Sequence, residues 1–252
     1  LFKSNPIINR IKKDNDHFRV FPADEIKSNK YSYWNIESIG GYRPIKLRSY
    51  EDLMSARGFS KPQILNMLNV KYVITRKKIN NSNFVKLDSI NGLYKNSNVL
   101  PKAWIVSDVK NVKSQRESLM ETLLTGFDPS KMAVVINYDG ENLPNYTDGD
   151  IEVKLRNENK IILESNSKTG GLLVLSEIYY GPGWKATING KETKIYQTNH
   201  ILRSIYMPKG QNEIIFEYNE SIFNKTRVLS RISFFIVLVA IGILFKRKNG
   251  FK

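Results

Sequence analysis

Several residue types are scarce or absent in this chain, and each absence excludes a kind of chemistry. The sequence has no cysteine and only two histidines, His17 and His200, which lie far apart. Disulfides, thiolate nucleophiles and zinc–cysteine sites are therefore excluded, and neither histidine has a partner at metal-ligand spacing. Glycine-rich nucleotide loops and the Gly-x-Ser-x-Gly turn of hydrolases are also missing. We predict no metal, no cofactor and no recognisable catalytic residue in this chain.

Acidic residues are few beside the basic ones. The chain has 39 Lys and Arg against 24 Asp and Glu, a formal net charge of +15. The excess is spread along the whole length, without a helix-turn-helix pattern, an aromatic ribonucleoprotein motif or an arginine-rich arm. Nucleic acid is therefore not a predicted partner. A general bias of composition accounts for the charge, and attraction to an anionic lipid surface or polymer is the alternative.

Long hydrophobic runs are lacking except for one near the C-terminus. It extends from Ile232 to Phe245, with Arg231 before it and Lys246-Arg247-Lys248 after it. The strict run makes about 21 Å of helix and, extended back to Val228, about 27 Å, against a hydrocarbon core of about 30 Å. Runs of this length can also be core helices of soluble proteins, but this one is apolar on all sides and ends in a basic cluster. We predict a transmembrane helix at residues 228–245 and a basic tail at 246–252.

The basic residues around this run also give a weak indication of sidedness. Four follow the run and three precede it: Lys246, Arg247, Lys248 and Lys252 against Lys225, Arg227 and Arg231. The positive-inside rule then places the tail in the cytoplasm and residues 1 to about 225 outside it. Because the chain opens without Met or a signal sequence, we interpret it as the C-terminal piece of a longer polypeptide, with residues 1–13 as a linker from the upstream part.

The hydrophobic pattern predicts an α+β protein with two globular segments. In residues 14–140 helical and extended patterns alternate, which predicts a small α/β-type or α+β domain. Residues 148–222 contain six or seven short strands with no helix, which predicts a β-sandwich of immunoglobulin-like or jelly-roll type. Asn189-Gly190 predicts a hairpin between strands at 184–188 and 193–196.

The segment from Tyr179 to Lys185 is the most promising candidate for ligand binding. Tyr179, Tyr180 and Trp184 surround a Gly-Pro-Gly turn and could stack on a sugar ring, while Lys185 could meet a phosphate or carboxylate. The alternative, which we favour, is a corner of the sandwich in which Trp184 fills the core. A weaker candidate of the same kind is Tyr42 with Arg43, beside Gly40-Gly41.

A series of short motifs in a fixed order carries a resemblance to a known family. They are Phe18-Arg19-Val20, Gly41-Tyr42, Leu47-Arg48-Ser49-Tyr50, Leu68-Asn69-Val70-Lys71-Tyr72-Val73-Ile74, Leu100-Pro101-Lys102-Ala103-Trp104, Gly183-Trp184-Lys185-Ala186, Asn189-Gly190, Ile205-Tyr206-Met207-Pro208-Lys209-Gly210 and Ile214-Ile215-Phe216-Glu217-Tyr218, followed by the apolar run. In this order the chain resembles the C-terminal extracytoplasmic region and last transmembrane helix of YfhO-like bacterial membrane proteins.

The resemblance implies a function for the intact protein. Members of that family resemble GT-C glycosyltransferases, which take sugars from polyprenyl-phosphate donors and modify glycans of the cell envelope. It implies a protein of the bacterial cell membrane that assists acceptor binding for an anionic surface glycan or teichoic acid. The acidic catalytic residue of GT-C enzymes lies near the N-terminus of the whole protein, so none can be carried over. The alternative is a non-catalytic, membrane-anchored carbohydrate-binding or assembly module.

Overall fold

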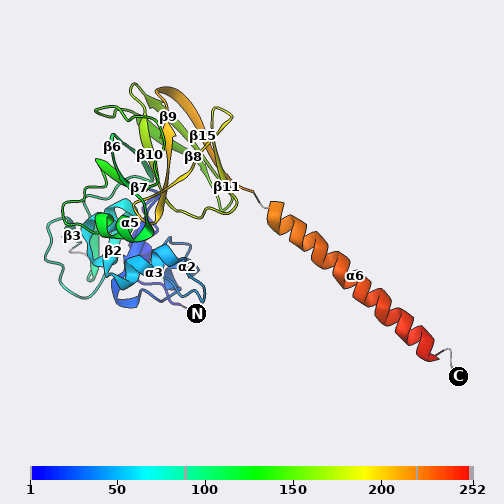
Figure 1. Cartoon of the computed structure of the whole chain (residues 1–252). Coiled ribbons are helices and arrows are strands. Elements are labelled where there is room, and N and C mark those ends of the chain that lie inside the picture. The colour runs from blue at the N-terminus through cyan, green and yellow to red at the C-terminus, as the bar shows by residue number, and fades with distance from the viewer. Residues whose placement is uncertain (1, 88–89, 220, 250–252) are drawn as a thin grey trace.

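The computed structural model describes residues 2–87, 90–219 and 221–249, and shows a globular part that carries one long helix (Figure 1). The globular part contains three β-sheets with short helices, and the long helix α6 (Ser221–Asn249) extends away from it. The predicted α+β class with one C-terminal apolar helix is confirmed.

The first sheet is built from the N-terminal hundred residues. Its strand order is β1-β2-β4-β3, with β1 parallel to β2 and the other pairs antiparallel. In chain order the elements of this region are α1 (Pro6–Ile11), β1 (Arg19–Pro22), η1 (Ala23–Glu25), α2 (Lys30–Tyr33), α3 (Arg48–Ser55), η2 (Gly58–Ser60), α4 (Pro62–Met67), β2 (Val70–Ile74), β3 (Phe84–Lys86) and β4 (Leu93–Asn96). Pro62 is the first residue of α4. Its missing N–H costs nothing there, because the N–H groups in the first turn of a helix have no carbonyl acceptor within the helix.

The second sheet draws its strands from both sides of the loop at residues 139–149. Its order is β5-β10-β14-β13-β7-β6. The strands are β5 (Ala103–Val106), β6 (Asp108–Val112), β7 (Met132–Ile136), β10 (Gly171–Ile178), β13 (Tyr196–Thr198) and β14 (Leu202–Met207), and α5 (Gln115–Thr122) lies between β6 and β7 in the chain. The two predicted globular segments are therefore joined through one sheet.

The third sheet is antiparallel and lies at the outside of the globular part. It has the order β12-β11-β15-β9-β8 and contains β8 (Asp150–Arg156), β9 (Lys160–Ser167), β11 (Trp184–Ile188), β12 (Lys191–Thr193) and β15 (Gly210–Tyr218). Asn189 and Gly190 have φ values of 50° and 79° and close the turn between β11 and β12, as the sequence predicts. The single strand expected at 193–196 is instead divided between two strands in different sheets. Strand β12 of the third sheet ends at Thr193, and β13 of the second sheet begins at Tyr196.

The apolar strand β10 explains how the layers are stacked. Leu173 and Leu175 join a cluster that also contains Leu163 of β9 and Phe216 of β15, so the second and third sheets pack face to face as a β-sandwich. Leu172 and Val174 point to the opposite face and join the largest cluster. Both faces of β10 are buried over residues 171–176, which is why residues 172–175 are all apolar rather than alternating.

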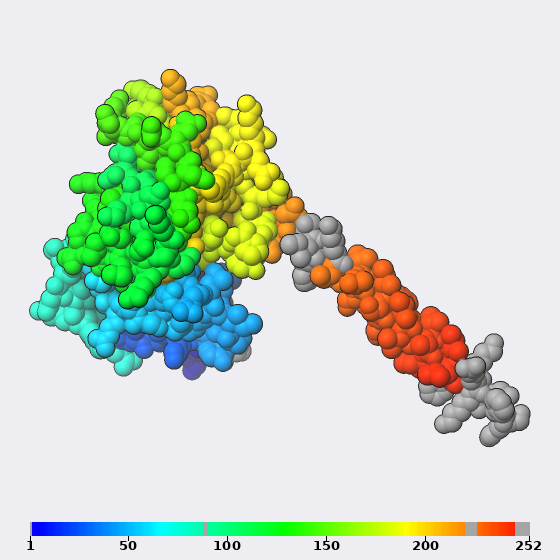
Figure 2. All heavy atoms as spheres, in the orientation of Figure 1, coloured from blue at the N-terminus to red at the C-terminus, as the bar shows by residue number. Residues whose placement is uncertain are grey.

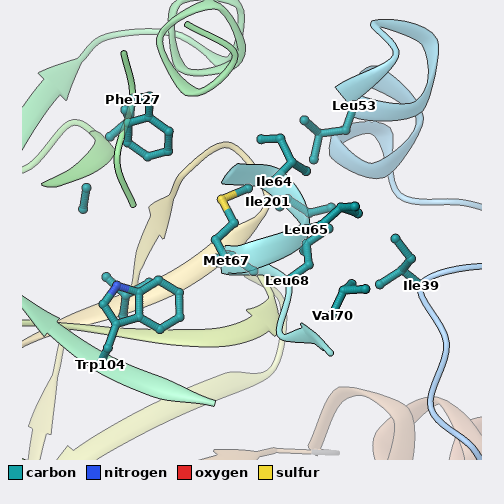
Figure 3. Close-up of a cluster of buried hydrophobic side chains, with 14 of the residues drawn as sticks. Ile39, Leu53, Ile64, Leu65, Met67, Leu68, Val70, Trp104, Phe127 and Ile201 are labelled. Carbon is teal, nitrogen blue, oxygen red and sulfur yellow. The ribbon is translucent and has the colours of Figure 1, made fainter. Parts of the chain in front are cut away.

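The largest cluster lies between the second sheet and the helices of the N-terminal region. Figure 3 shows Leu53 of α3, Ile64 and Met67 of α4 and Trp104 of β5 in this cluster. The Trp104 indole donates its N–H to the Pro129 carbonyl at 2.7 Å, so its polar atom is satisfied inside the core.

The helix α6 has the properties of a membrane span. Its segment Thr226–Leu244 has an apolar composition and a length sufficient to cross a bilayer, and none of it is buried against the rest of the protein. Figure 2 shows it standing clear of the globular part. The predicted span at 228–245 falls on this helix. Of the predicted tail, residues 246–249 continue α6 and residues 250–252 lie outside the described part of the chain.

Candidate functional site

A cleft of about 640 Å³ lies beside the loop that precedes α3. This volume lies within the range of about 300–1,000 Å³ that is usual for ligand sites. The cleft is bounded by residues from α2, the loop at 35–47, β1, β8 and β10: Arg19, Asn29, Ser32, Asn35, Ile36, Glu37, Ser38, Ile39, Gly40, Gly41, Arg43, Ile45, Lys46, Leu47, Tyr50, Leu68, Arg156, Ile178, Ile201 and Leu202. Segments far apart in sequence thus build one site.

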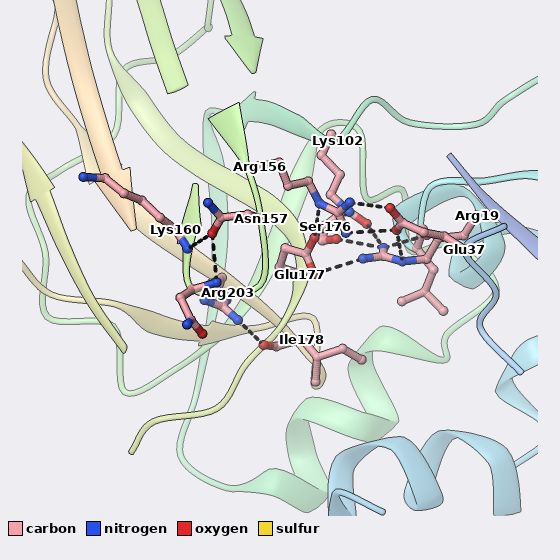
Figure 4. A network of polar contacts seen from close by, with 12 residues as sticks. Arg19, Glu37, Lys102, Arg156, Asn157, Lys160, Ser176, Glu177, Ile178 and Arg203 are labelled. Atoms are coloured by element: carbon pink, nitrogen blue, oxygen red, sulfur yellow. Dashed lines mark hydrogen bonds and ion pairs between the residues drawn. The ribbon is translucent and has the colours of Figure 1, made fainter. Parts of the chain in front are cut away.

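A network of charges, most of them largely buried, borders this cleft through Arg19, Glu37 and Arg156 (Figure 4). Glu177 at the end of β10 accepts from three cations: Arg19 at 3.0 Å, Arg156 at 2.9 Å and Lys102 at 2.6 Å. Arg156 also forms a bidentate ion pair with Glu37. The network contains three cations and two carboxylates, so it retains one excess positive charge next to the cleft.

The pKa values of Glu177 and Lys102 are shifted by burial and by the neighbouring charges of the network. Burial by itself raises the pKa of Glu177, but Arg19, Lys102 and Arg156 outweigh it and bring the pKa down to about 2. Burial and the charge of Arg19 lower the pKa of Lys102 to about 8, against the attraction of Glu177. Glu177 is therefore a carboxylate at neutral pH and serves as the centre that holds the cations in place.

The network joins all three sheets. Arg19 is in β1 of the first sheet, Glu177 in β10 of the second and Arg156 in β8 of the third. Arg19 additionally donates to the Ser176 carbonyl at 2.8 Å and to the Leu68 carbonyl at 3.1 Å. One role of these residues is thus to clamp the layers together at the point where the cleft opens.

The loop before α3 contributes Arg43, Ile45, Lys46 and Leu47 to the cleft, and α2 contributes Ser32; residues 42–48 are called the rim segment below. Tyr42 and Arg43 are the two binding candidates in this segment, and only Arg43 lines the cleft. Tyr42 is 65% exposed and does not line it. Ser32 and Asn35 add hydroxyl and amide groups to the lining. Cations combined with neutral hydrogen-bonding groups suit a ligand that carries both anionic groups and hydroxyls.

The aromatic turn forms a second, smaller hollow of about 190 Å³. The candidates Tyr179, Tyr180, Trp184 and Lys185 all line it, so the structure brings these four together. It keeps them in a different hollow from Arg43. The Lys185 ammonium is 3.3 Å from the Glu192 carboxylate and so is already paired.

Trp184 has contacts on the protein side as well as on the hollow. The guanidinium of Arg203 lies 4.2 Å from the centre of its ring, and the ring meets Tyr218 edge-on at 5.8 Å. Trp184 also packs against the core between the second and third sheets. These contacts favour the interpretation in which Trp184 fills a corner of the sandwich, while binding at the hollow stays a prediction.

Sequence reasoning did not select Arg19, Glu37, Arg156 or Glu177 as site residues. One signal was present: Glu177 lies near the end of a strand whose preceding residues are mostly apolar and buried, and a buried carboxylate requires cationic partners. The identity of those partners depends on how three sheets converge, which the pattern of a single strand does not contain.

A three-sheet globular part carried on one helix of membrane-spanning length defines a membrane-anchored protein with an extramembrane domain. The family model described as bacterial membrane protein YfhO matches residues 146–230, which cover β8 to β15 and the start of α6. The resemblance to this family is thus confirmed over that segment. No curated protein and no solved structure matches the chain.

Proposed function

We propose that this chain is the acceptor-binding part of an envelope protein that resembles lipid-linked-sugar-dependent GT-C glycosyltransferases. The intact protein would transfer a sugar from a polyprenyl-phosphate donor to an anionic surface glycan or teichoic acid. The match to the YfhO family supports the membrane setting of this proposal. The observation that carries the binding role is the cleft with Arg43, Lys46 and the Arg19–Arg156 wall.

The chemistry of the cleft supports an anionic, hydroxyl-rich ligand. Arg43 has no ion-pair partner within 4.0 Å among the described residues, so its guanidinium is free for a phosphate or carboxylate. The hydroxyl of Ser32 and the amide of Asn35 can serve sugar hydroxyls. An apolar floor that includes Ile178 and Leu202 suits the C–H face of a sugar ring.

The proposed role is binding and orientation rather than chemistry. Glycosyl transfer needs a base for the acceptor hydroxyl and stabilisation of the departing phosphate. In this proposal both groups belong to a part of the protein upstream of residue 1, and the extramembrane part lies outside the cytoplasm, where surface glycans are. The aromatic turn at Tyr179, Tyr180, Trp184 and Lys185 would be an accessory contact for the same polymer.

A binding titration tests the proposal. The full chain in detergent is titrated with synthetic poly(glycerol phosphate), the backbone polymer of one class of teichoic acid. Charge reversal by Arg43→Glu should weaken binding at least about tenfold, since a charge-assisted contact contributes about 1.5–3 kcal/mol. Lys168→Glu is the matched control, because Lys168 lies in an exposed turn outside the cleft. Equal affinity of Arg43→Glu and the parent chain would overturn the role of the cleft.

The alternative function is a non-catalytic carbohydrate-binding or assembly module, which uses the same cleft. The two differ in the upstream sequence: about ten or more membrane spans with an acidic residue in the first outer loop favour the transferase. One or two spans favour the module.

A further inference from the structure

We propose that the rim segment, residues 42–48, docks the globular part onto the surface of an anionic lipid bilayer. The segment is the loop before α3 together with the first residue of that helix, and it forms the outer lip of the cleft. The proposal does not depend on which ligand occupies the cleft.

Large apolar side chains of the rim segment are exposed to solvent. Ile45 is 87% exposed, Tyr42 65% and Leu47 39%. Isolated exposed apolar residues are common on soluble proteins, but here three lie within six positions of one loop. A tyrosine with aliphatic neighbours is the combination that settles at the headgroup level of a membrane.

The same segment is cationic. Arg43, Lys46 and Arg48 alternate with the apolar residues, and the segment contains no acidic residue. Lys46 and Arg48 form ion pairs with Glu51 at 3.3 Å and Asp52 at 3.0 Å, and the Arg48 side chain is 91% exposed. Exposed pairs of this kind contribute little to stability, so lipid phosphates can replace the carboxylates. Charge and apolar exposure therefore point to one partner, an anionic bilayer.

The exposure is built into the fold, because the base of the segment is hydrogen-bonded on both sides. Gly41 donates its N–H to the Ile26 carbonyl at 2.6 Å, and Asn29 accepts from the Tyr42 N–H at 2.7 Å. On the other side the Tyr50 hydroxyl donates to the Ile39 carbonyl at 2.6 Å. The segment is thus held out from the surface in a defined position.

The tether to the membrane is short. Strand β15 ends at Tyr218 and α6 begins at Ser221, and the apolar segment of α6 starts at Thr226. The five residues before Thr226 make about 8 Å of helix. The globular part therefore stays next to the bilayer surface. In Figure 1 the labels of α2 and α3 lie on the lower side of the globular part, the direction in which α6 runs.

Docking by the rim segment would place the mouth of the cleft at the level of the lipid headgroups. A phosphate or sugar carried on a lipid then reaches Arg43 without leaving the membrane.

Site-specific labelling tests the proposal, since the chain has no cysteine of its own. Ile45→Cys and Lys168→Cys are each labelled with an environment-sensitive fluorophore in the full chain, reconstituted in nanodiscs. Lys168 lies in the turn before the first residue of β10, whereas the last residue of that strand, Ile178, lines the cleft. Position 168 is therefore at the end of β10 that is remote from the cleft. The label at position 45 should shift to the blue and be quenched by spin-labelled lipids in phosphatidylglycerol-containing discs, whereas the label at 168 should not.

A charge-reversal variant gives a second test of membrane docking. Arg48→Glu, added to Ile45→Cys, should reduce the equilibrium for loop contact by at least about fivefold, the factor that one cation near an anionic surface provides. Arg48 does not line the cleft, so binding of soluble poly(glycerol phosphate) should be retained. Equal quenching at positions 45 and 168 would overturn membrane docking, and would leave the acceptor-binding proposal to its own titration.

Discussion

Trp184 is the residue at which a structural and a binding role are most directly opposed. Its ring is contacted by Arg203 and Tyr218 and packs against the core between two sheets, yet it also lines the small hollow of the aromatic turn. The residue before it, Gly183, has φ +90°, and a side chain there would collide with the Tyr218 ring at 2.6 Å. The local backbone is thus shaped by the packing of the two rings.

We expect Trp184→Ala to lower the free energy of unfolding by about 3 kcal/mol, the lower end of the range for large aromatic deletions because Trp184 is only partly buried. Denaturant unfolding of the full chain in detergent, followed by circular dichroism, measures this loss. Tyr180→Ala is the control: Tyr180 is 43% exposed and should cost less than about 0.5 kcal/mol. Unchanged stability of Trp184→Ala with weakened glycan binding would instead make the turn a sugar platform.

At the residue scale the sequence identified side chains with unusual local chemistry, and missed those whose role depends on distant partners. Arg43 stands beside a glycine pair and does line the larger cleft. Arg19 and Arg156 look like ordinary strand residues, and they become site residues only because Glu177 lies between them in space. No local signal pairs Glu177 with Arg19, which is 158 positions away, or with Arg156, which is 21 positions away.

Among the elements, β10 and the charge network decide how the layers are held. Because β10 contributes side chains to two cores, and because Glu177 at its end binds cations from β1 and β8, the three sheets meet at one point. Removal of the central carboxylate would leave Arg19, Lys102 and Arg156 buried and without their shared counter-charge.

Glu177→Gln tests this clamp. The loss of the carboxylate should destabilise the chain by about 3 kcal/mol at pH 7, as the breaking of buried ion pairs does. Its pKa falls from 4.5 to about 2 on folding, so the parent gains this stability above pH 4.5 and loses roughly 3 kcal/mol as the pH falls from 4.5 to 2.

Unfolding measured between pH 7 and pH 2 should therefore show a steep acid loss in the parent chain and a flatter profile in Glu177→Gln. Glu213→Gln is the matched control, since Glu213 is exposed on β15 and should behave as the parent. Parallel pH profiles of all three chains would contradict the clamp.

The elements themselves show which patterns a sequence carries. Strong period-two segments and the Asn189-Gly190 hairpin were predicted and are confirmed. The strand β6 (Asp108–Val112) was missed because it is an edge strand with one buried residue and little alternation. The change of sheet between Thr193 and Tyr196 was also missed, because two short strands in different sheets look like one in sequence.

On the scale of the whole molecule, one chain contains a membrane-spanning helix, a cleft lined by cations and a basic, apolar rim segment. The apolar run was visible in the sequence because lipid imposes a strong compositional signal over about 20 residues. The cleft was not visible, since its walls come from α2, the rim segment and all three sheets. The proposed role in binding envelope glycans requires that the globular part lies outside the cytoplasm.

Single-cysteine topology mapping in intact bacteria tests that claim most directly, with Lys191→Cys on the exposed β11–β12 hairpin and Asn249→Cys after the span, each in the naturally cysteine-free chain. We expect a membrane-impermeant thiol reagent to label position 191 in intact cells, and to label position 249 only after the cells are opened. Labelling of position 249 in intact cells, with position 191 protected, would contradict an extracytoplasmic location and, with it, the proposed role in binding surface glycans.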